Sequence, residues 1–288
     1  MLKCLLTLYL LGSLSPSAFG YIPDLEMILD RTAKNQGNTG YVIDLEISFD
    51  NKSQTQVVKE HWVIENAESL RVFARGERDL KEQLSLLRIY DKSKKFYMDE
   101  SGTVRSTRFS GEFFEPLFHI RTVKKLHRAL IDLSILPEAS TRHKSAPIDV
   151  KEPTYDKVPY LRLSRAAGVI AYALGMPPQK DATQLNPEIW IEQDRFVIRK
   201  MRLPSQTEIV ADDYQKFVGS LSFPQTRTVR WANNSVKIRV INIKNTPVTS
   251  KIRELLSPKI FTEEKKKAEK LNVLPEDPII QEFYSRFR

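Results

Sequence analysis

Cysteine and glycine are scarce in this chain of 288 residues, which has one cysteine and ten glycines. A single cysteine excludes a scaffold held by disulfides and a zinc site built from cysteine ligands. So few glycines argue against a fold that depends on a glycine-rich nucleotide-binding loop, and against a collagen-like repeat. Histidine is also rare, with four in the chain. His119 and His127 are about two helical turns apart and could hold a metal only with a third ligand from elsewhere.

The motifs of common enzyme families are missing as well. The sequence has no Gly-x-Ser-x-Gly, no phosphate-binding loop, no Gly-x-Gly-x-x-Gly and no His-Glu-x-x-His. Asp212 and Asp213 end a predicted strand, where a turn or surface role is more common than a catalytic carboxylate pair. An enzyme is therefore the weaker interpretation, and the sequence predicts no catalytic residue, no metal and no cofactor.

The composition is that of a soluble globular protein, with 41% hydrophobic residues and a mean hydropathy of −0.37. These values exclude a polytopic membrane protein and a disordered chain. Lysine and arginine outnumber the acids by 45 to 36, which gives a net charge of +9 that is spread along the whole chain. Such an excess suits anionic lipid headgroups or nucleic acid.

The first twenty residues have the pattern of a secretory signal peptide. Lys3 precedes a short apolar run at 5–11, and Ala18-Phe19-Gly20 places small residues before a cut after Gly20. The run is too short to span a bilayer, and Cys4 comes too early to be a lipoprotein's acylated cysteine. We therefore expect an exported, soluble, periplasmic protein, with a net charge of 44 − 36 = +8 after cleavage. Export argues against a nucleic-acid partner.

The rest of the chain reads mostly as strands. Pro23 and Asp24 open a predicted helix of roughly ten residues, with Asp24 as its N-cap. Segment 41–49 then alternates strictly between apolar and polar residues, as a half-buried strand does. Its apolar side carries Tyr41, Ile43, Leu45, Ile47 and Phe49. Further strands are predicted at 57–65, 69–76, 84–90, 94–99, 103–109, 159–165, 168–174, 188–193, 195–203, 206–214, 221–231 and 235–243.

Helices are predicted in the middle and at the end of the chain. Apolar residues at helical spacing predict an amphipathic helix over 121–135 that packs on the sheet. The tail from Ser250 is predicted to be helical, and its last part has one apolar stripe. The stripe consists of Ile279, Ile280, Phe283, Tyr284 and Phe287. It either docks on the parent domain or binds a partner.

Three local patterns follow one another along the predicted strands. Trp62 is followed by Glu-Ser-Leu-Arg-Val at 68–72, and Leu-Leu-Arg-Ile-Tyr-Asp at 86–91 by Lys-Lys-Phe at 94–96. The longest pattern covers 188–231. It includes Ile189-Trp190-Ile191-Glu192-Gln193-Asp194, Thr207-Glu208-Ile209, Asp213-Tyr214 and Phe223-Pro224. In this order the patterns resemble those of the periplasmic outer-membrane lipoprotein carrier (LolA-like) family. The sequence departs from the family's aromatic residues at Leu70, Val72 and Arg88.

The resemblance covers 21–256 and implies three parts. Residues 1–20 are the signal peptide, 21–256 a LolA-like lipid- or lipoprotein-binding domain, and 257–288 a helical C-terminal extension. The implied fold is mainly β with helices, an unclosed antiparallel β-barrel covered by helices. Family members hold lipoprotein acyl chains on the apolar inner face or, in a sensor branch, detect them and bind a membrane-bound regulator.

The resemblance also implies a set of ligand-binding residues. The predicted lining is Tyr41, Ile43, Leu45, Ile47, Trp62, Val72, Phe96 and Trp190. In the family, the arginine at the position of Arg71 helps to hold a lid closed through backbone hydrogen bonds. The alternatives are plain core residues for the lining and a surface or strand-edge arginine for Arg71.

We therefore expect a soluble periplasmic carrier of lipid or lipoprotein acyl chains without chemistry of its own. The alternative is an envelope sensor or assembly factor whose tail binds a membrane or periplasmic protein. A third interpretation, a hydrolase on the same fold, requires a nucleophile that the sequence does not offer.

Overall fold

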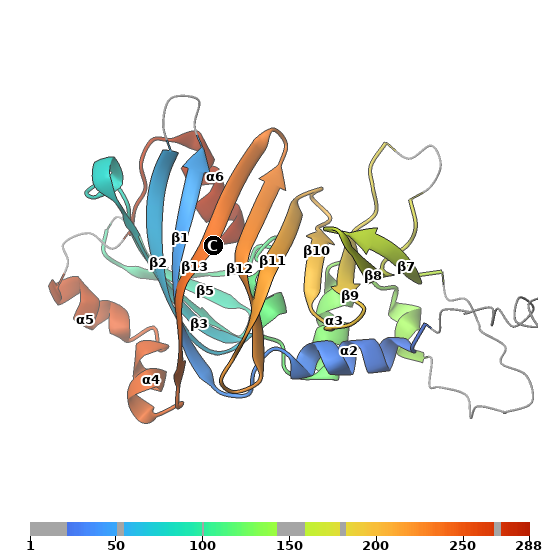
Figure 1. The fold of residues 1–288 in the computed structure, drawn as a ribbon. Helices are drawn as coiled ribbons and strands as arrows, with labels where there is room; N and C mark the ends of the chain where they lie inside the picture. Colours follow the sequence, from blue (N-terminus) through green and yellow to red (C-terminus); the bar gives the residue numbers. More distant parts are fainter. Residues whose placement is uncertain (1–21, 51–54, 100, 143–158, 179–182, 268–271) are drawn as a thin grey trace, which may run out of the picture.

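A computed structural model describes residues 22–50, 55–99, 101–142, 159–178, 183–267 and 272–288 (Figure 1). The predicted signal peptide and His143 lie outside these residues. Across the part of the chain that is described, no helix is both long and apolar enough to cross a bilayer.

Strands dominate the structure, and all thirteen predicted strands are present. In chain order they are β1 (Gly40–Asp50), β2 (Thr55–Asn66), β3 (Ser69–Gly76), β4 (Ser85–Asp91), β5 (Lys94–Met98), β6 (Val104–Arg108), β7 (Leu161–Ala166), β8 (Val169–Leu174), β9 (Glu188–Glu192), β10 (Ile198–Arg202), β11 (Glu208–Phe217), β12 (Leu221–Trp231) and β13 (Asn234–Thr246). A two-residue strand that was not predicted, β14 (Asn272–Val273), follows them.

The strands form one antiparallel sheet in the order β6-β5-β4-β3-β2-β1-β13-β12-β11-β10-β9-β8-β7, with β14 paired to β4. Pairing β1 with β13 brings the two meanders together at the centre. The ends of this path, β6 and β7, are not paired with each other among the described residues. The predicted mainly-β fold, with an unclosed antiparallel sheet and a few helices, is confirmed.

The sheet has an inner face and an outer face, and β1 defines them. The five residues of its predicted apolar side are all buried, while the side chains between them are partly exposed. We call the face that carries these five residues the inner face. Figure 1 shows the sheet curving, so that β3 and β5 lie behind β1 and β13.

The helices cover both faces. The helices before the tail are α2 (Leu25–Lys34) and α3 (Val123–Asp132), and short 3₁₀ turns are η1 (Arg78–Leu80), η2 (Glu115–Phe118) and η3 (Glu138–Arg142). Asp24 caps α2 as predicted, because its carboxylate accepts a 2.7 Å hydrogen bond from the Met27 amide. The predicted middle helix is confirmed as α3, which buries Leu126, Leu130 and Ile131.

The tail passes from one face of the sheet to the other. Helices α4 (Ser250–Leu255) and α5 (Ile260–Lys267) place Leu255, Ile260 and Phe261 in a cluster with Leu87 and Ile89 on the outer face. Strand β14 then pairs with the start of β4. The last helix, α6 (Pro278–Phe287), joins the main core on the inner face. Its apolar stripe therefore docks on the parent domain.

Candidate functional site

Six of the nine predicted ligand-binding residues lie together on the inner face. They are Tyr41, Ile43, Leu45 and Ile47 of β1, Trp62 of β2 and Val72 of β3. All six are at most 1% exposed. The register explains the grouping, because Ile43 lies opposite Trp62 and Trp62 lies opposite Val72. Residues directly opposite each other in an antiparallel pair point to the same face.

The other three, Arg71, Phe96 and Trp190, are not on this face. Arg71 precedes Val72, and neighbouring residues of a strand point to opposite faces. Its guanidinium lies 6.0 Å from the ring of Phe73, which belongs to the outer cluster. The structure thus separates Arg71 from the lining that it was expected to close.

Phe96 and Trp190 lie in two separate outer clusters. Phe96 is opposite Ile89 and packs with it beneath α5. Trp190 packs with three alanines of β7 and β8, and Lys200 and Arg202 lie over its ring at 5.2 and 5.3 Å. Both residues are structural parts of the outer face.

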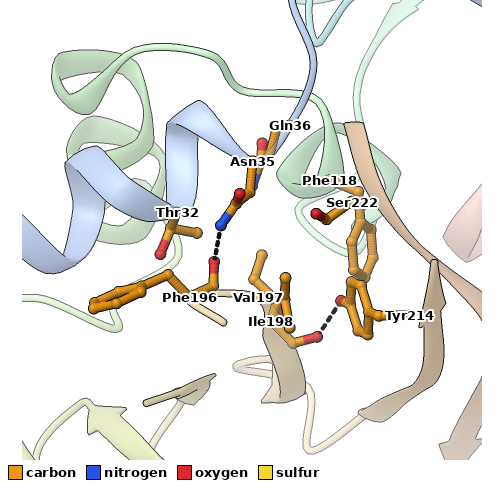
Figure 2. A pocket seen from close by; sticks show the side chains of 9 residues that line it. All are labelled: Thr32, Asn35, Gln36, Phe118, Phe196, Val197, Ile198, Tyr214 and Ser222. Carbon is orange, nitrogen blue, oxygen red and sulfur yellow. Dashed lines mark hydrogen bonds between the residues drawn. The ribbon is translucent and has the colours of Figure 1, made fainter. Parts of the chain in front are cut away.

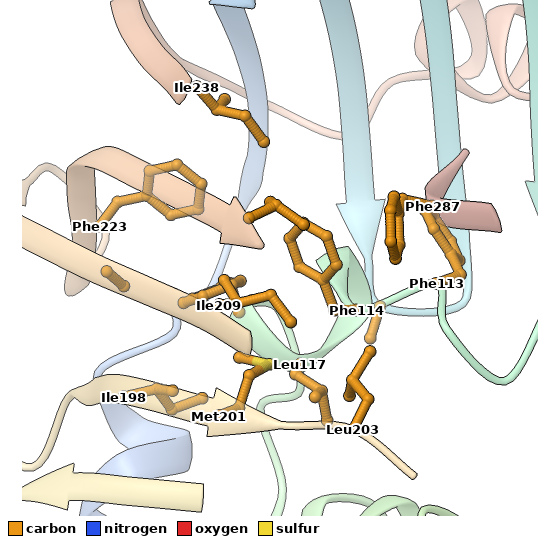
Figure 3. Close-up of a cluster of buried hydrophobic side chains, with 14 of the residues drawn as sticks. Phe113, Phe114, Leu117, Ile198, Met201, Leu203, Ile209, Phe223, Ile238 and Phe287 are labelled. Atoms are coloured by element: carbon orange, nitrogen blue, oxygen red, sulfur yellow. The ribbon is translucent and has the colours of Figure 1, made fainter. Parts of the chain in front are cut away.

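The inner face is filled by α6 and by segment 113–118. Phe283 of α6 meets Phe49 of β1 edge-on, with ring centroids 5.3 Å apart. Phe287 meets Trp231 of β12 at 5.2 Å and Phe114 at 6.1 Å. Figure 3 shows Phe113, Phe114 and Phe287 side by side, with Phe223 and Ile238 of the sheet farther along the same cluster.

A buried ion pair lies where α6 ends. The Arg288 guanidinium donates from Nε to both carboxylate oxygens of Glu60, at 3.0 and 3.1 Å, and both side chains are fully buried. The indole of Trp62 donates to the same carboxylate at 2.9 Å. The guanidinium also lies between aromatic rings, 5.2 Å from Trp62 and 5.0 Å from Phe283. Burial would lower the pKa of Arg288, but the two carboxylates Glu60 and Glu115 outweigh it and raise that pKa.

A second buried pair joins segment 113–118 to the sheet. Arg227 of β12 donates to Glu115, and both side chains are buried. Burial would raise the pKa of Glu115, but Arg227 and Arg288 outweigh it and hold that pKa below its ordinary value. Burial lowers the pKa of the neighbouring His119 to about 3, against the opposing effect of Glu115. The imidazole is therefore neutral at physiological pH.

One pocket near these residues is small. A pocket between α2, β10 and β11 is lined by Thr32, Asn35, Gln36, Phe118, Phe196, Val197, Ile198, Tyr214 and Ser222 (Figure 2). Its free volume of about 10 Å³ suits one water molecule and no acyl chain. Asn35 donates to the Phe196 carbonyl at 3.2 Å, and Tyr214 donates to the Ile198 carbonyl. Both bonds join residues of the pocket wall.

Sequence reasoning missed the charged residues of the inner face. Glu60 occupies an inward position of β2, between Val58 and Trp62, and an acid at such a position is a detectable signal of a buried partner. Arg288 follows the apolar stripe directly, but its partner lies 228 residues away in sequence. Local pattern does not reveal that pairing.

Within the described residues, no group of three or more histidine, cysteine, aspartate or glutamate side chains converges as a metal site requires.

Neither a protein-family model nor a curated protein matches the sequence. The chain is similar to several solved structures at low identity. One is a LolA superfamily protein from Nitrosomonas europaea, with 12% identity, a TM-score of 0.49, and coverage of 80% of this chain and 97% of that one. Another is a DUF1329 family protein from Desulfovibrio piger, with 10% identity, a TM-score of 0.48, and coverage of 83% and 100%.

Proposed function

We propose that this protein binds the acyl chains of lipids or lipoproteins on its inner face and carries them through the periplasm. The observation that carries the proposal is the grouping of six predicted lining residues in one cluster of buried apolar side chains on the inner face. An acyl chain is apolar along its length, so it needs an apolar surface and no catalytic group. Each buried methylene contributes about 0.8 kcal/mol, and ten of them about 8 kcal/mol. The resemblance to lipoprotein carriers in the sequence supports the same ligand class.

The three tryptophans provide a test of both ligand and location. Trp62 and Trp231 lie on the inner face, and Trp190 lies on the outer face. A fatty acid brominated on its chain quenches only those tryptophans that it contacts. We would titrate it into residues 21–288 and into two variants, Trp190→Phe and the double variant Trp62→Phe/Trp231→Phe. Circular dichroism confirms that each variant is folded.

The expected result is strong quenching in Trp190→Phe and little in the double variant. Quenching confined to the double variant would move the ligand to the outer face and reject the proposed site. Native mass spectrometry of protein purified from a bacterial periplasm adds a second measurement, since a carrier should retain a co-purifying lipid. A protein without bound lipid would refute the function if neither the native chain nor a folded variant with α6 released takes up any fatty acid.

The alternative function is the binding of a protein partner through the tail, and it requires the apolar stripe of α6 to be accessible. The stripe of α6 that would meet such a partner is buried against the sheet. A partner at this helix therefore has to withdraw it first.

A further inference from the structure

We propose that α6 is a resident, displaceable ligand of the inner face, and that α6 and an acyl chain compete for the same surface. The inference rests on the proposed function, and it adds how the binding site is regulated. A carrier with this arrangement is closed until its own helix leaves.

The apolar stripe of α6 packs on the face where the acyl ligand is proposed to bind. Ile280, Phe283, Tyr284 and Phe287 recur at the spacing of one helical face, and each is at most 3% exposed. Phe283 packs on Phe49, which continues the apolar side of β1. A chain bound along this side of β1 would overlap the rings of α6, so both cannot be seated together.

Polar contacts lock the helix in place from its second half onward. Arg286 donates to Glu112 at 2.7 Å and to the Thr207 hydroxyl at 3.1 Å. Arg288 fills the site between Glu60 and the aromatic rings, and Lys95 donates to the backbone oxygen of Arg288 at 2.9 Å. Such directional bonds set one seating of the helix, which apolar packing alone would not specify.

The chain before α6 is suited to a hinge. Strand β14 pairs with β4 through only two residues, Asn272 and Val273. The stretch 274–277 follows, where Asp277 caps α6 through the amides of Ile279 and Ile280 at 2.9 and 3.1 Å. Because the cap bonds lie within the helix segment, α6 can leave the sheet as a folded unit while α4 and α5 stay on the outer face.

A tethered helix competes at a high effective concentration, since it never diffuses away. A free ligand therefore binds more weakly to the closed protein than to a protein whose helix is released. The competition predicts opposite effects of fixing α6 and of loosening it, and these can be measured separately.

The test for fixing uses an introduced pair of cysteines. The Asn234 amide lies 3.5 Å from the Glu282 carboxylate, so Asn234→Cys/Glu282→Cys can be joined by a short bifunctional thiol reagent. The sole natural cysteine, Cys4, lies in the predicted signal peptide, so no other thiol interferes. The matched control, Glu65→Cys/Arg253→Cys, ties α4 to β2 at an ion pair of 3.7 Å and leaves α6 free.

The test for loosening is the variant Phe283→Ala/Arg288→Gln, which removes one ring and the buried charge. A fluorescent fatty acid is the ligand in every titration. We expect at least tenfold weaker uptake after cross-linking α6, unchanged uptake after cross-linking the control, and at least tenfold tighter uptake by the loosened variant. Circular dichroism and urea unfolding verify that the loosened variant is folded. If that variant does not fold, Glu60→Gln is used to release α6 instead, because it removes the carboxylate charge that pairs with Arg288.

The outcomes separate the two proposals. Uptake that is the same with α6 cross-linked and free would overturn the competition and leave acyl binding intact. No uptake by the native chain, combined with uptake by a released variant, supports the competition strongly. No uptake by the native chain or by any folded released variant would reject acyl binding, and the resident-ligand role with it.

Discussion

Substitutions of Arg288 and Glu60 should have strongly coupled effects on the free energy of unfolding, although the two residues are 228 positions apart in sequence. Replacing Arg288 with methionine keeps most of its length and removes its charge. It leaves the Glu60 carboxylate fully buried and without the guanidinium, while the Trp62 indole still donates to it. Breaking a buried ion pair in this way costs about 3–5 kcal/mol, because one charge remains without compensation.

The expected magnitude follows from the geometry of the pair. Charges about 4 Å apart attract by about 4 kcal/mol at the effective dielectric of a protein site. Glu60→Gln/Arg288→Met removes both charges and so avoids leaving either one alone. We expect the double variant to lose at least about 2 kcal/mol less than the sum of the single losses.

The assay is urea unfolding of the four proteins, followed by circular dichroism and by tryptophan emission. Hydrogen exchange at the α6 amides accompanies it, because α6 can open locally before the sheet unfolds. Losses that add within about 0.5 kcal/mol, without faster exchange in α6, would refute the reasoning. The pair would then contribute neither to the fold nor to the seating of α6.

Three further predictions concern other parts of the molecule. Asp24→Ala should cost about 1 kcal/mol of unfolding free energy by removing the cap of α2, whereas Asp24→Ser should restore most of it. His119 has a pKa of about 3 in the fold, where burial outweighs the opposing Glu115, and about 6.5 when unfolded. The unfolded chain therefore binds the extra proton between these values, so stability is full above about pH 6.5 and falls as the pH drops toward 3. The difference between the urea unfolding midpoints at pH 7 and pH 4.5 should be smaller in His119→Phe than in the native chain. An equal difference in the two proteins would contradict this. Tyr41→Phe removes the hydroxyl's 2.9 Å bond to the Gly219 carbonyl and should cost about 1 kcal/mol in thermal unfolding, with no change in far-ultraviolet dichroism.

Local pattern in the sequence determined the elements of this protein. The alternation in 41–49 identifies β1 because each apolar residue of a half-buried strand points toward the core, whatever the rest of the chain does. Asp24 predicts the start of α2 for an equally local reason, a side chain that bonds the first turn. The short turns between the strands predict an antiparallel meander, which the sheet confirms.

Only the tertiary structure decided which side of each strand faces inward. Alternation divides a strand into two sets of residues but does not state which set is inside when both contain large side chains. Arg71 and Val72 were assigned to one site although a strand sends neighbours to opposite faces. Trp190 was assigned to the lining from the family resemblance, and it lies on the outer face instead.

The seating of α6 was also beyond the sequence. Its apolar stripe is visible in the residues, but a stripe fits a partner as well as the parent sheet. The choice depends on contacts that join distant parts of the chain, such as Phe283 with Phe49 and Arg288 with Glu60. Such pairs have no local signature, because they form only when the curved sheet brings β1 and β2 around the helix.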